Sequence, residues 1–192
     1  VMLPSDPITR PLSGISEADI VFEMPVTENG VTRIMAVYYC GQPAEIGSVR
    51  SARKEFIPLA GALNAVYAHW GGEHNALDQL NSGTLDNIDA LKYEDIYYFR
   101  KKGIKMPHNG FTSYDLLSKA AKDFKYSNKS GLKIGKSTAK KIKEAARDIL
   151  TVDQPATQSL PALYAEPFDV SWTYNEKENK YLRFRNKTPE TD

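Results

Sequence analysis

Two arginines three residues apart lie in the segment EIGSVRSARKEF, residues 45–56, where a strand pattern gives way to a helix pattern. Arg50 leaves the predicted strand and Arg53 enters the predicted helix, with Ser51 between them. A guanidinium group binds phosphate or carboxylate through parallel hydrogen bonds, and the start of a helix favours anions. The segment therefore predicts an anion site formed by Arg50, Ser51 and Arg53.

Other polar residues close neighbouring segments and are candidates for the same site. Arg33 lies on the preceding predicted strand, and Arg100 ends a later one. Ligand sites of α/β sheets form where the carboxyl ends of strands converge, so these arginines are expected to approach Arg50. His69, in YAHWGGEH, and the His108–Asn109 pair, in PHNG, are expected at the rim as hydrogen-bond donors.

The same arginines have an alternative, purely structural interpretation. They could form internal salt bridges, because perturbed charge clusters mark functional sites only statistically. The acidic residues considered as partners are Glu23, Glu45, Asp78, Asp86 and Asp89. The sequence leaves the two interpretations open.

Other site chemistries have weaker support. His69, Glu73, His74 and His108 could converge on a metal, but their spacing matches no recognised zinc motif, so a metallohydrolase stays an alternative. GLKIGKST, residues 131–138, is one residue short of a phosphate-binding loop. We predict no cofactor, and the single cysteine, Cys40, is expected to be a small buried residue.

The charge is unevenly distributed along the 192 residues, whose net charge is +1. Residues 119–147 contain ten lysines and arginines against two acidic residues, a net +8. Such a segment is usually a solvated face, and it also suits an anionic lipid or polymer. Few aromatic residues interrupt it, which does not favour nucleic acid as a partner.

Hydrophobic periodicity predicts an α/β (α+β) protein with a mixed sheet layered against helices. The predicted strands are residues 18–26, 31–40, 65–70 and 96–100, and the predicted helices are residues 51–64, 73–83, 114–124 and 138–150. Residues 168–175 and 180–185 predict a C-terminal β-hairpin. We expect a first domain over 1–150, a linker over 151–163, and the start of an incomplete second domain over 164–192.

Several motifs in order resemble the YerB-like family of bacterial lipoproteins, a family of unknown function with an N-terminal and a C-terminal domain. The motifs are ITRPLSGISEADIVFEMPV, GVTRIMAVYY, IGSVRSAR, VYAHWGG, PHNGFTS and FDVSWTYNEKENKYLRFR. The resemblance implies an extracytoplasmic, lipid-anchored protein of the bacterial envelope, whose signal and lipobox cysteine would lie upstream of Val1. It implies no established catalytic residues.

A weaker likeness is to LytR-CpsA-Psr phosphotransferases, in which arginines after a strand bind a polyprenyl pyrophosphate. Arg33, Arg50 and Arg53 would be the matching arginines, and Asp19 is the nearest match to that family's metal-binding aspartates. The expected ligand is then a phosphate-bearing small molecule, a polyprenyl phosphate or an anionic envelope polymer. A non-catalytic interaction module with structural arginines is the alternative, and whether the protein is an enzyme stays open.

Overall fold

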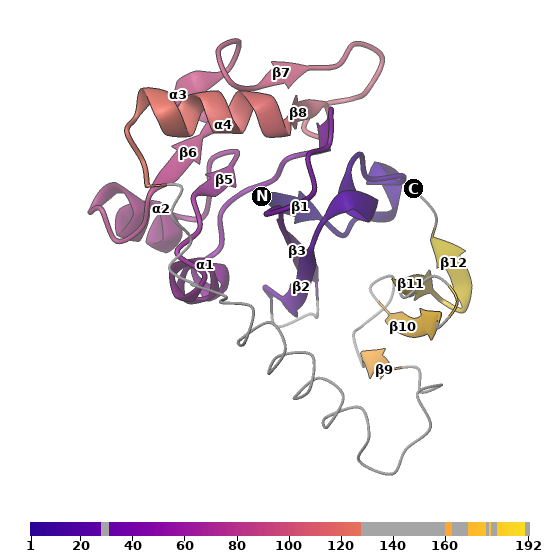
Figure 1. Ribbon diagram of the computed structural model, residues 1–192. Coiled ribbons are helices and arrows are strands. Elements are labelled where there is room, and N and C mark those ends of the chain that lie inside the picture. The colour runs from indigo at the N-terminus through magenta and orange to yellow at the C-terminus, as the bar shows by residue number, and fades with distance from the viewer. Residues whose placement is uncertain (28–30, 128–159, 163–168, 176, 178–179, 191–192) are drawn as a thin grey trace.

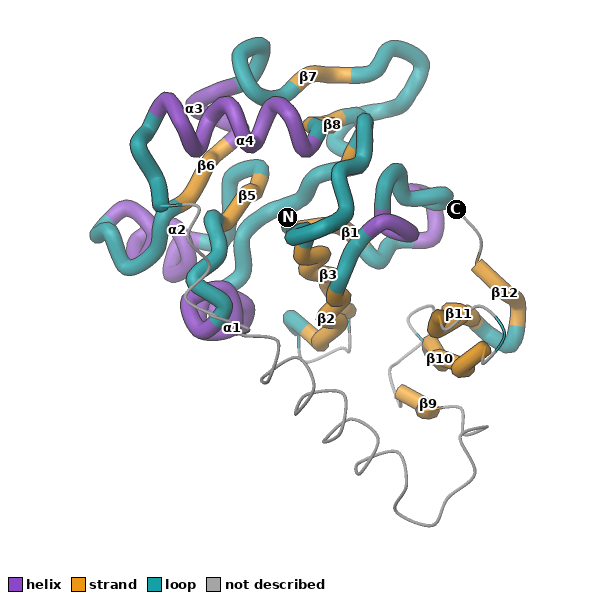
Figure 2. The backbone as a smooth tube through the Cα atoms, viewed as in Figure 1, coloured by secondary structure: helices purple, strands orange, loops and turns teal. Residues whose placement is uncertain are grey.

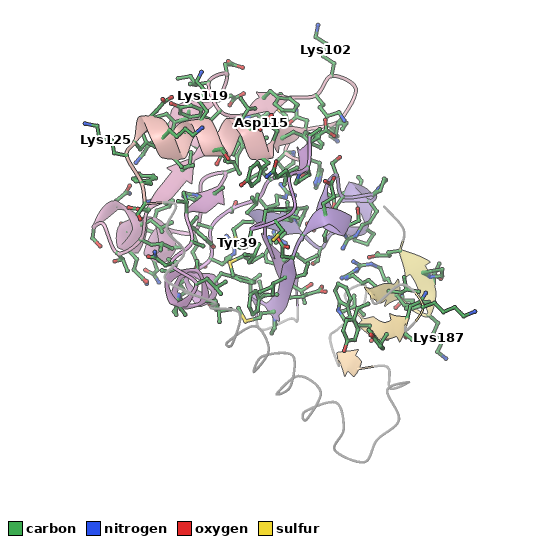
Figure 3. All side chains as sticks on the ribbon, in the orientation of Figure 1. Tyr39, Lys102, Asp115, Lys119, Lys125 and Lys187 are labelled. Carbon is green, nitrogen blue, oxygen red and sulfur yellow. The ribbon has the colours of Figure 1, made fainter. Side chains whose placement is uncertain are left out.

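The computed structural model describes residues 1–27, 31–127, 160–162, 169–175, 177 and 180–190. The expected helix at 138–150, the GLKIGKST segment and most of the expected linker lie outside these residues. So does most of the lysine-rich segment. In its described part, Lys119 and Lys122 are exposed on a helix and Lys125 is exposed in the turn after it, and Figure 3 shows Lys119 and Lys125 pointing away from the protein. They form a solvated basic face.

The first sheet is antiparallel and holds the N-terminal segment at one edge. Its strands, in the order β1-β3-β2, are β1 (Met2–Pro4), β2 (Ile20–Pro25) and β3 (Thr32–Val37). Pro4 and Met24 both pair with Arg33 across the sheet. Side chains alternate between the two faces of a strand, so Arg33 shares a face with Met35 and Val37, which belong to or pack against one apolar core. Arg33 therefore ends an otherwise apolar face.

The remaining strands of the N-terminal region form two smaller sheets. Strands β4 (Ile46–Gly47), β8 (Gly110–Thr112) and β7 (Phe99–Arg100) are antiparallel, in the order β4-β8-β7. Strands β5 (Tyr67–His69) and β6 (Asn87–Asp89) are parallel. The α+β class predicted from the sequence is confirmed, with parallel and antiparallel pairs distributed over separate small sheets.

Short helices surround these sheets (Figure 1). They are η1 (Pro7–Thr9), η2 (Ile15–Glu17), η3 (Lys54–Phe56), α1 (Ile57–Ala62), α2 (His74–Asn81), α3 (Ala90–Tyr93) and α4 (Tyr114–Asp123). Ser113 caps α4 by accepting a hydrogen bond from the backbone N–H of Leu116, a role in which serine is favoured. The helix expected at 51–64 is shorter, because Pro58 suits only its first turn and a 3-10 turn precedes it.

An extended segment, residues 48–53, joins the first sheet to the parallel pair; we call it the bridging segment. Figure 2 shows it as a loop running between β1 and β5. The backbone N–H of Arg50 donates to Met2 O at 2.8 Å, and the N–H of Trp70 donates to Arg50 O at 3.0 Å. These bonds fix the backbone from which Arg50 and Arg53 project.

The C-terminal strands form a sheet of their own, which we call the C-terminal sheet. Its strands, in the order β12-β11-β10-β9, are β9 (Leu160–Ala162), β10 (Val170–Asn175), β11 (Lys180–Arg185) and β12 (Thr188–Glu190). The predicted hairpin is the β10–β11 pair, extended by one strand on each side. Within the described part of the chain, no helix has the length and apolar character to span a membrane.

Candidate functional site

Three arginines from two elements form one group, which we call the arginine cluster: Arg33 of β3, and Arg50 and Arg53 of the bridging segment. The side chains of Arg33 and Arg50 are each 13% exposed. The nearest carboxylate is that of Asp6, which follows β1, and its Oδ2 lies 3.5 Å from Arg33 Nη1 and 3.8 Å from Arg50 Nη2. Both distances are long for a charge-assisted hydrogen bond, so one carboxylate only partly neutralises the group.

The electrostatics show how close the guanidinium groups are. Burial lowers the pKa of Arg33, and the positive charges of Arg53 and Arg50 lower it further. The negative charge of Asp6 raises this pKa but does not outweigh the other effects. Burial and the charge of Arg53 likewise lower the pKa of Arg50. Arginine stays protonated at neutral pH even so, and the cluster therefore carries an excess of positive charge.

The hydrogen bonds of the cluster are incomplete. Arg33 Nη1 donates to Thr32 O at 3.0 Å, and Arg50 Nη1 donates to Pro107 O at 3.2 Å. The Nε atoms of Arg33 and Arg50 are both buried and find no acceptor among the described residues. A buried donor without an acceptor costs free energy, so these two N–H groups favour an additional acceptor.

His108 joins the cluster from the loop that precedes β8. Its Nδ1 lies 3.0 Å from Arg50 Nη2, and because a guanidinium only donates, Nδ1 must be the acceptor. Burial, together with the charges of Arg50 and Arg33, lowers the pKa of His108. The ring is therefore neutral at pH 7, and its proton resides on Nε2, which is a hydrogen-bond donor.

Arg53 is held by its own backbone and by a tyrosine. Its Nη1 donates to Ala52 O at 3.0 Å, and the Tyr67 hydroxyl lies 3.4 Å from both the backbone N and the O of Arg53. The helical N–H groups expected beside Arg53 are not free, because the N–H of Lys54 donates to Glu73 Oε1 at 3.0 Å. The candidate site thus consists of side chains, without a helix start. Ser51 is half-buried between the two arginines.

Arg100 and Asn109, also predicted for the site, belong to a different group. Arg100 donates to both carboxylate oxygens of Glu94 at 2.5 and 3.0 Å, and to Asn109 Oδ1 at 2.9 Å. Its guanidinium also lies 4.4 Å from the ring centroid of Trp70. Arg100 is therefore satisfied internally, and it holds the loop that carries His108.

His69, expected at the rim, is a core residue that is 1% exposed. Its Nδ1 lies 2.7 Å from Gly71 O and its Nε2 lies 3.2 Å from Asn87 Oδ1. The Asp89 carboxylate fixes the same turn by accepting from the N–H groups of Gly71 and Leu91 at 2.8 and 3.0 Å. His69 thus connects β5 to β6 and has no ring nitrogen left for a ligand.

The structure does not bring together the residues considered for a metal. Among the described residues, no three histidine, cysteine, aspartate or glutamate side chains are grouped closely enough to hold an ion. His74 is largely exposed beside Asp78. Asp19 accepts from the backbone N–H groups of Tyr39, Cys40 and Gly41, so it fixes a turn. Cys40 itself is exposed, contrary to the expectation, because it lies in that turn after β3 ends.

Among the described residues, no ion pair joins the arginine cluster to Glu23, Glu45, Asp78, Asp86 or Asp89, the partners considered from sequence. Glu23 pairs with Arg183, and Glu45 pairs with Lys101. The carboxylate beside the arginine cluster is Asp6, a residue that no sequence pattern singled out. Asp6 reaches the cluster because β1 pairs with β3 and Pro4 lies opposite Arg33. The two strands are about thirty residues apart in sequence, so local patterns do not reveal this pairing.

An apolar cavity of about 490 Å³ lies beside β3. Met35 and Val37 of β3 line it, together with Ala60 of α1 and Tyr67 of β5. Tyr67 thus lines the cavity and also contacts Arg53 through its hydroxyl.

Comparisons with known proteins agree on one group of relatives. The family model described as "Protein of unknown function (DUF3048) N-terminal domain" matches residues 1–127. The "Putative lipoprotein YerB" of Bacillus subtilis is 37% identical over 126 residues, which are 66% of this chain and 38% of that protein. A crystal structure of the Bacillus subtilis YerB protein superposes with a TM-score of 0.74 and 28% sequence identity. The superposition covers 100% of this chain and 62% of the crystallised chain. The chain thus spans less than two thirds of the length of either relative.

Proposed function

The chain belongs to the DUF3048 family of unknown function, and we propose that its arginine cluster binds an anionic, phosphate-bearing ligand. One observation carries the proposal: Arg33 and Arg50, with the charge of Arg53 close by, share one loosely held carboxylate, and the buried Nε atoms of Arg33 and Arg50 have no acceptor among the described residues. Arginine forks match the geometry of phosphate oxygens. The Nε2–H of neutral His108 adds a donor without adding charge.

The source of the phosphate is a matter for experiment. Free phosphate or pyrophosphate would need the cluster alone. A polyprenyl phosphate would also need room for an apolar chain, and the cavity beside Tyr67 supports including such a lipid in the test. An anionic envelope polymer is the third source. The name of the Bacillus subtilis relative supports an extracytoplasmic, lipid-anchored location, in which the last two sources occur.

The first experiment is calorimetric titration of the 192-residue protein with phosphate, pyrophosphate and a short-chain polyprenyl phosphate. The Arg50→Ala/Arg53→Ala variant should lose binding of whichever anion binds. The Lys119→Ala/Lys122→Ala variant removes the same charge from the exposed face of α4 and should bind like the wild type. A ligand at 100 times its dissociation constant adds about 2.7 kcal/mol to stability, so thermal shift gives an independent readout.

A structural role for the arginines is the second candidate, because each also donates to a backbone carbonyl: Thr32 O, Pro107 O and Ala52 O. In that case the protein is a non-catalytic interaction module. The Arg50→Ala/Arg53→Ala variant would then melt early, and no anion would bind the wild type. Binding of an anion to the wild type, lost in a variant that remains folded, would contradict this candidate.

A further inference from the structure

Asp6 lies in the arginine cluster where a ligand anion would bind. Its carboxylate is 3.5 Å from Arg33 and 3.8 Å from Arg50, and its side chain is 28% exposed. Among the described residues, it is the one carboxylate within ion-pair distance of these two arginines. A negative charge at this position competes with an incoming anion for the same donors.

The backbone that carries Asp6 is attached to the C-terminal sheet on both sides. Before it, Arg185 Nη2 donates to Ser5 O at 2.5 Å. After it, Arg10 Nε lies 3.1 Å from Glu190 Oε2. Glu190 in turn accepts hydrogen bonds from Arg185 and Arg183. The segment from Ser5 to Arg10 is therefore fixed at two points by strands more than 170 residues away in sequence.

The C-terminal sheet is itself anchored to the first sheet by a buried ion pair. Arg183 donates from Nε and Nη2 to the two carboxylate oxygens of Glu23, at 3.0 and 2.7 Å. Both side chains are at most 6% exposed. Glu23 lies on β2, opposite Ile34 of β3, which is the neighbour of Arg33. The sheet is thus attached beside the strand that carries the cluster.

We propose that the C-terminal sheet regulates the arginine cluster by holding Asp6 against it, so that displacement of the sheet opens the cluster to anions. This inference rests on the proposed anion binding. Asp6 is the internal competitor, and the attachments through Arg185 and Arg10 keep it in place. When the sheet is displaced, the segment from Ser5 to Arg10 loses both attachments and Asp6 withdraws from Arg33 and Arg50.

The test is a double-mutant cycle on pyrophosphate binding, measured by calorimetry on the 192-residue protein. Asp6→Asn removes the competing charge and should tighten binding about tenfold. Arg185→Met removes the hydrogen bond to Ser5 O and should tighten binding several-fold when Asp6 is present, and not at all in the Asp6→Asn protein. Lys187→Met is the matched control, because Lys187 is exposed and points away from the C-terminal sheet in Figure 3; it should leave binding unchanged.

A second readout needs no ligand. The charge of Asp6 raises the pKa of His108, so the NMR titration of the His108 ring reports whether Asp6 is in place. Arg185→Met should lower that pKa in the wild-type background and leave it unchanged beside Asp6→Asn. If Arg185→Met fails to fold, Arg185→Lys, which shortens the reach to Ser5 O, should change both readouts in the same direction by less.

The outcomes separate the two proposals. Equal effects of Arg185→Met in the two backgrounds, on either readout, would overturn the regulation by the C-terminal sheet. If pyrophosphate binds to no variant, including Asp6→Asn, the proposed function fails, and the His108 titration still decides whether the sheet positions Asp6.

Discussion

At the scale of single residues, Arg50 and Arg100 differ in how many hydrogen-bond acceptors surround the guanidinium group. Arg100 has two carboxylate oxygens, an amide oxygen and the Trp70 ring around it. Arg50 has one backbone carbonyl, one imidazole nitrogen and a carboxylate at 3.8 Å. A guanidinium group has five N–H donors, so the difference in acceptors separates a structural arginine from a candidate ligand arginine.

The first residue-scale prediction concerns the protonation of His108. Its pKa should lie below the ordinary 6.5, and Arg50→Met should raise it toward that value, because the nearby guanidinium charge disfavours the imidazolium. The folded protein then binds fewer protons than the unfolded one near pH 6. The contribution to stability is therefore complete above pH 6.5 and decreases as the pH falls below it.

NMR titration of the His108 ring measures this directly in the wild type, in Arg50→Met and in the control Lys102→Met. Lys102 is exposed on the loop after β7, where Figure 3 shows it pointing into solvent. A pKa of 6.5 or higher in the wild type, or no change in Arg50→Met, would contradict the effect of burial and of the Arg50 charge on His108.

At the scale of elements, glycines let the backbones of β4 and β8 pack closely against aromatic rings. A Cβ atom added at Gly110 would lie 2.3 Å from the ring of Trp70, whereas one added at Gly61 of α1 would meet no atom within 4 Å. Gly110 follows directly after the loop that carries His108 and Asn109. The small residue therefore lets that loop approach Trp70 and Arg100.

This contrast predicts opposite effects of one substitution at two sites. Gly110→Ala should destabilise the protein by roughly 1–3 kcal/mol, because the ring or the strand must move. Gly61→Ala should stabilise it by up to about 1 kcal/mol, because alanine favours helix at an open position. Urea unfolding measures both. A neutral Gly110→Ala would show that β8 can shift without cost.

At the scale of the whole molecule, buried charges hold the C-terminal sheet against the first sheet. Burial alone would raise the pKa of Glu190, but the hydrogen bond from Arg185 and the charges of Arg10 and Arg183 outweigh it and lower that pKa. Burial and the charge of Arg183 lower the pKa of Arg10 to about 10. Removing one partner of such a group leaves a buried charge uncompensated, which typically costs 3–5 kcal/mol.

The lowered pKa of Glu190 predicts acid sensitivity. The folded state holds Glu190 ionised more strongly than the unfolded state does, so its contribution to stability is complete above pH 4.5. That contribution is lost as the pH falls through the lower folded pKa. Melting temperatures at pH 7, 4.5 and 3 should show this loss in the wild type and less of it in Glu190→Gln. The exposed Glu17→Gln is the control, and an equal acid dependence in Glu190→Gln would contradict the prediction.

The sequence by itself determined the class of the fold and the features that depend on neighbours along the chain. The apolar runs over 18–26 and 31–40 predicted β2 and β3, the helix pattern over 114–124 predicted α4, and the motif resemblance indicated the family. It also singled out Arg33, Arg50, Arg53 and His108. These signals are local, since periodicity and capping act over a few residues.

Only the tertiary structure decided which charges meet. It placed Asp6 beside Arg33, 27 residues away, and joined Glu23 to Arg183, 160 residues away. It also assigned His69 and Arg100 to structural roles, because their partners come from other elements. Coulomb and hydrogen-bond energies depend on distance in space, and the order of residues in the chain does not fix that distance until strands pair and sheets pack.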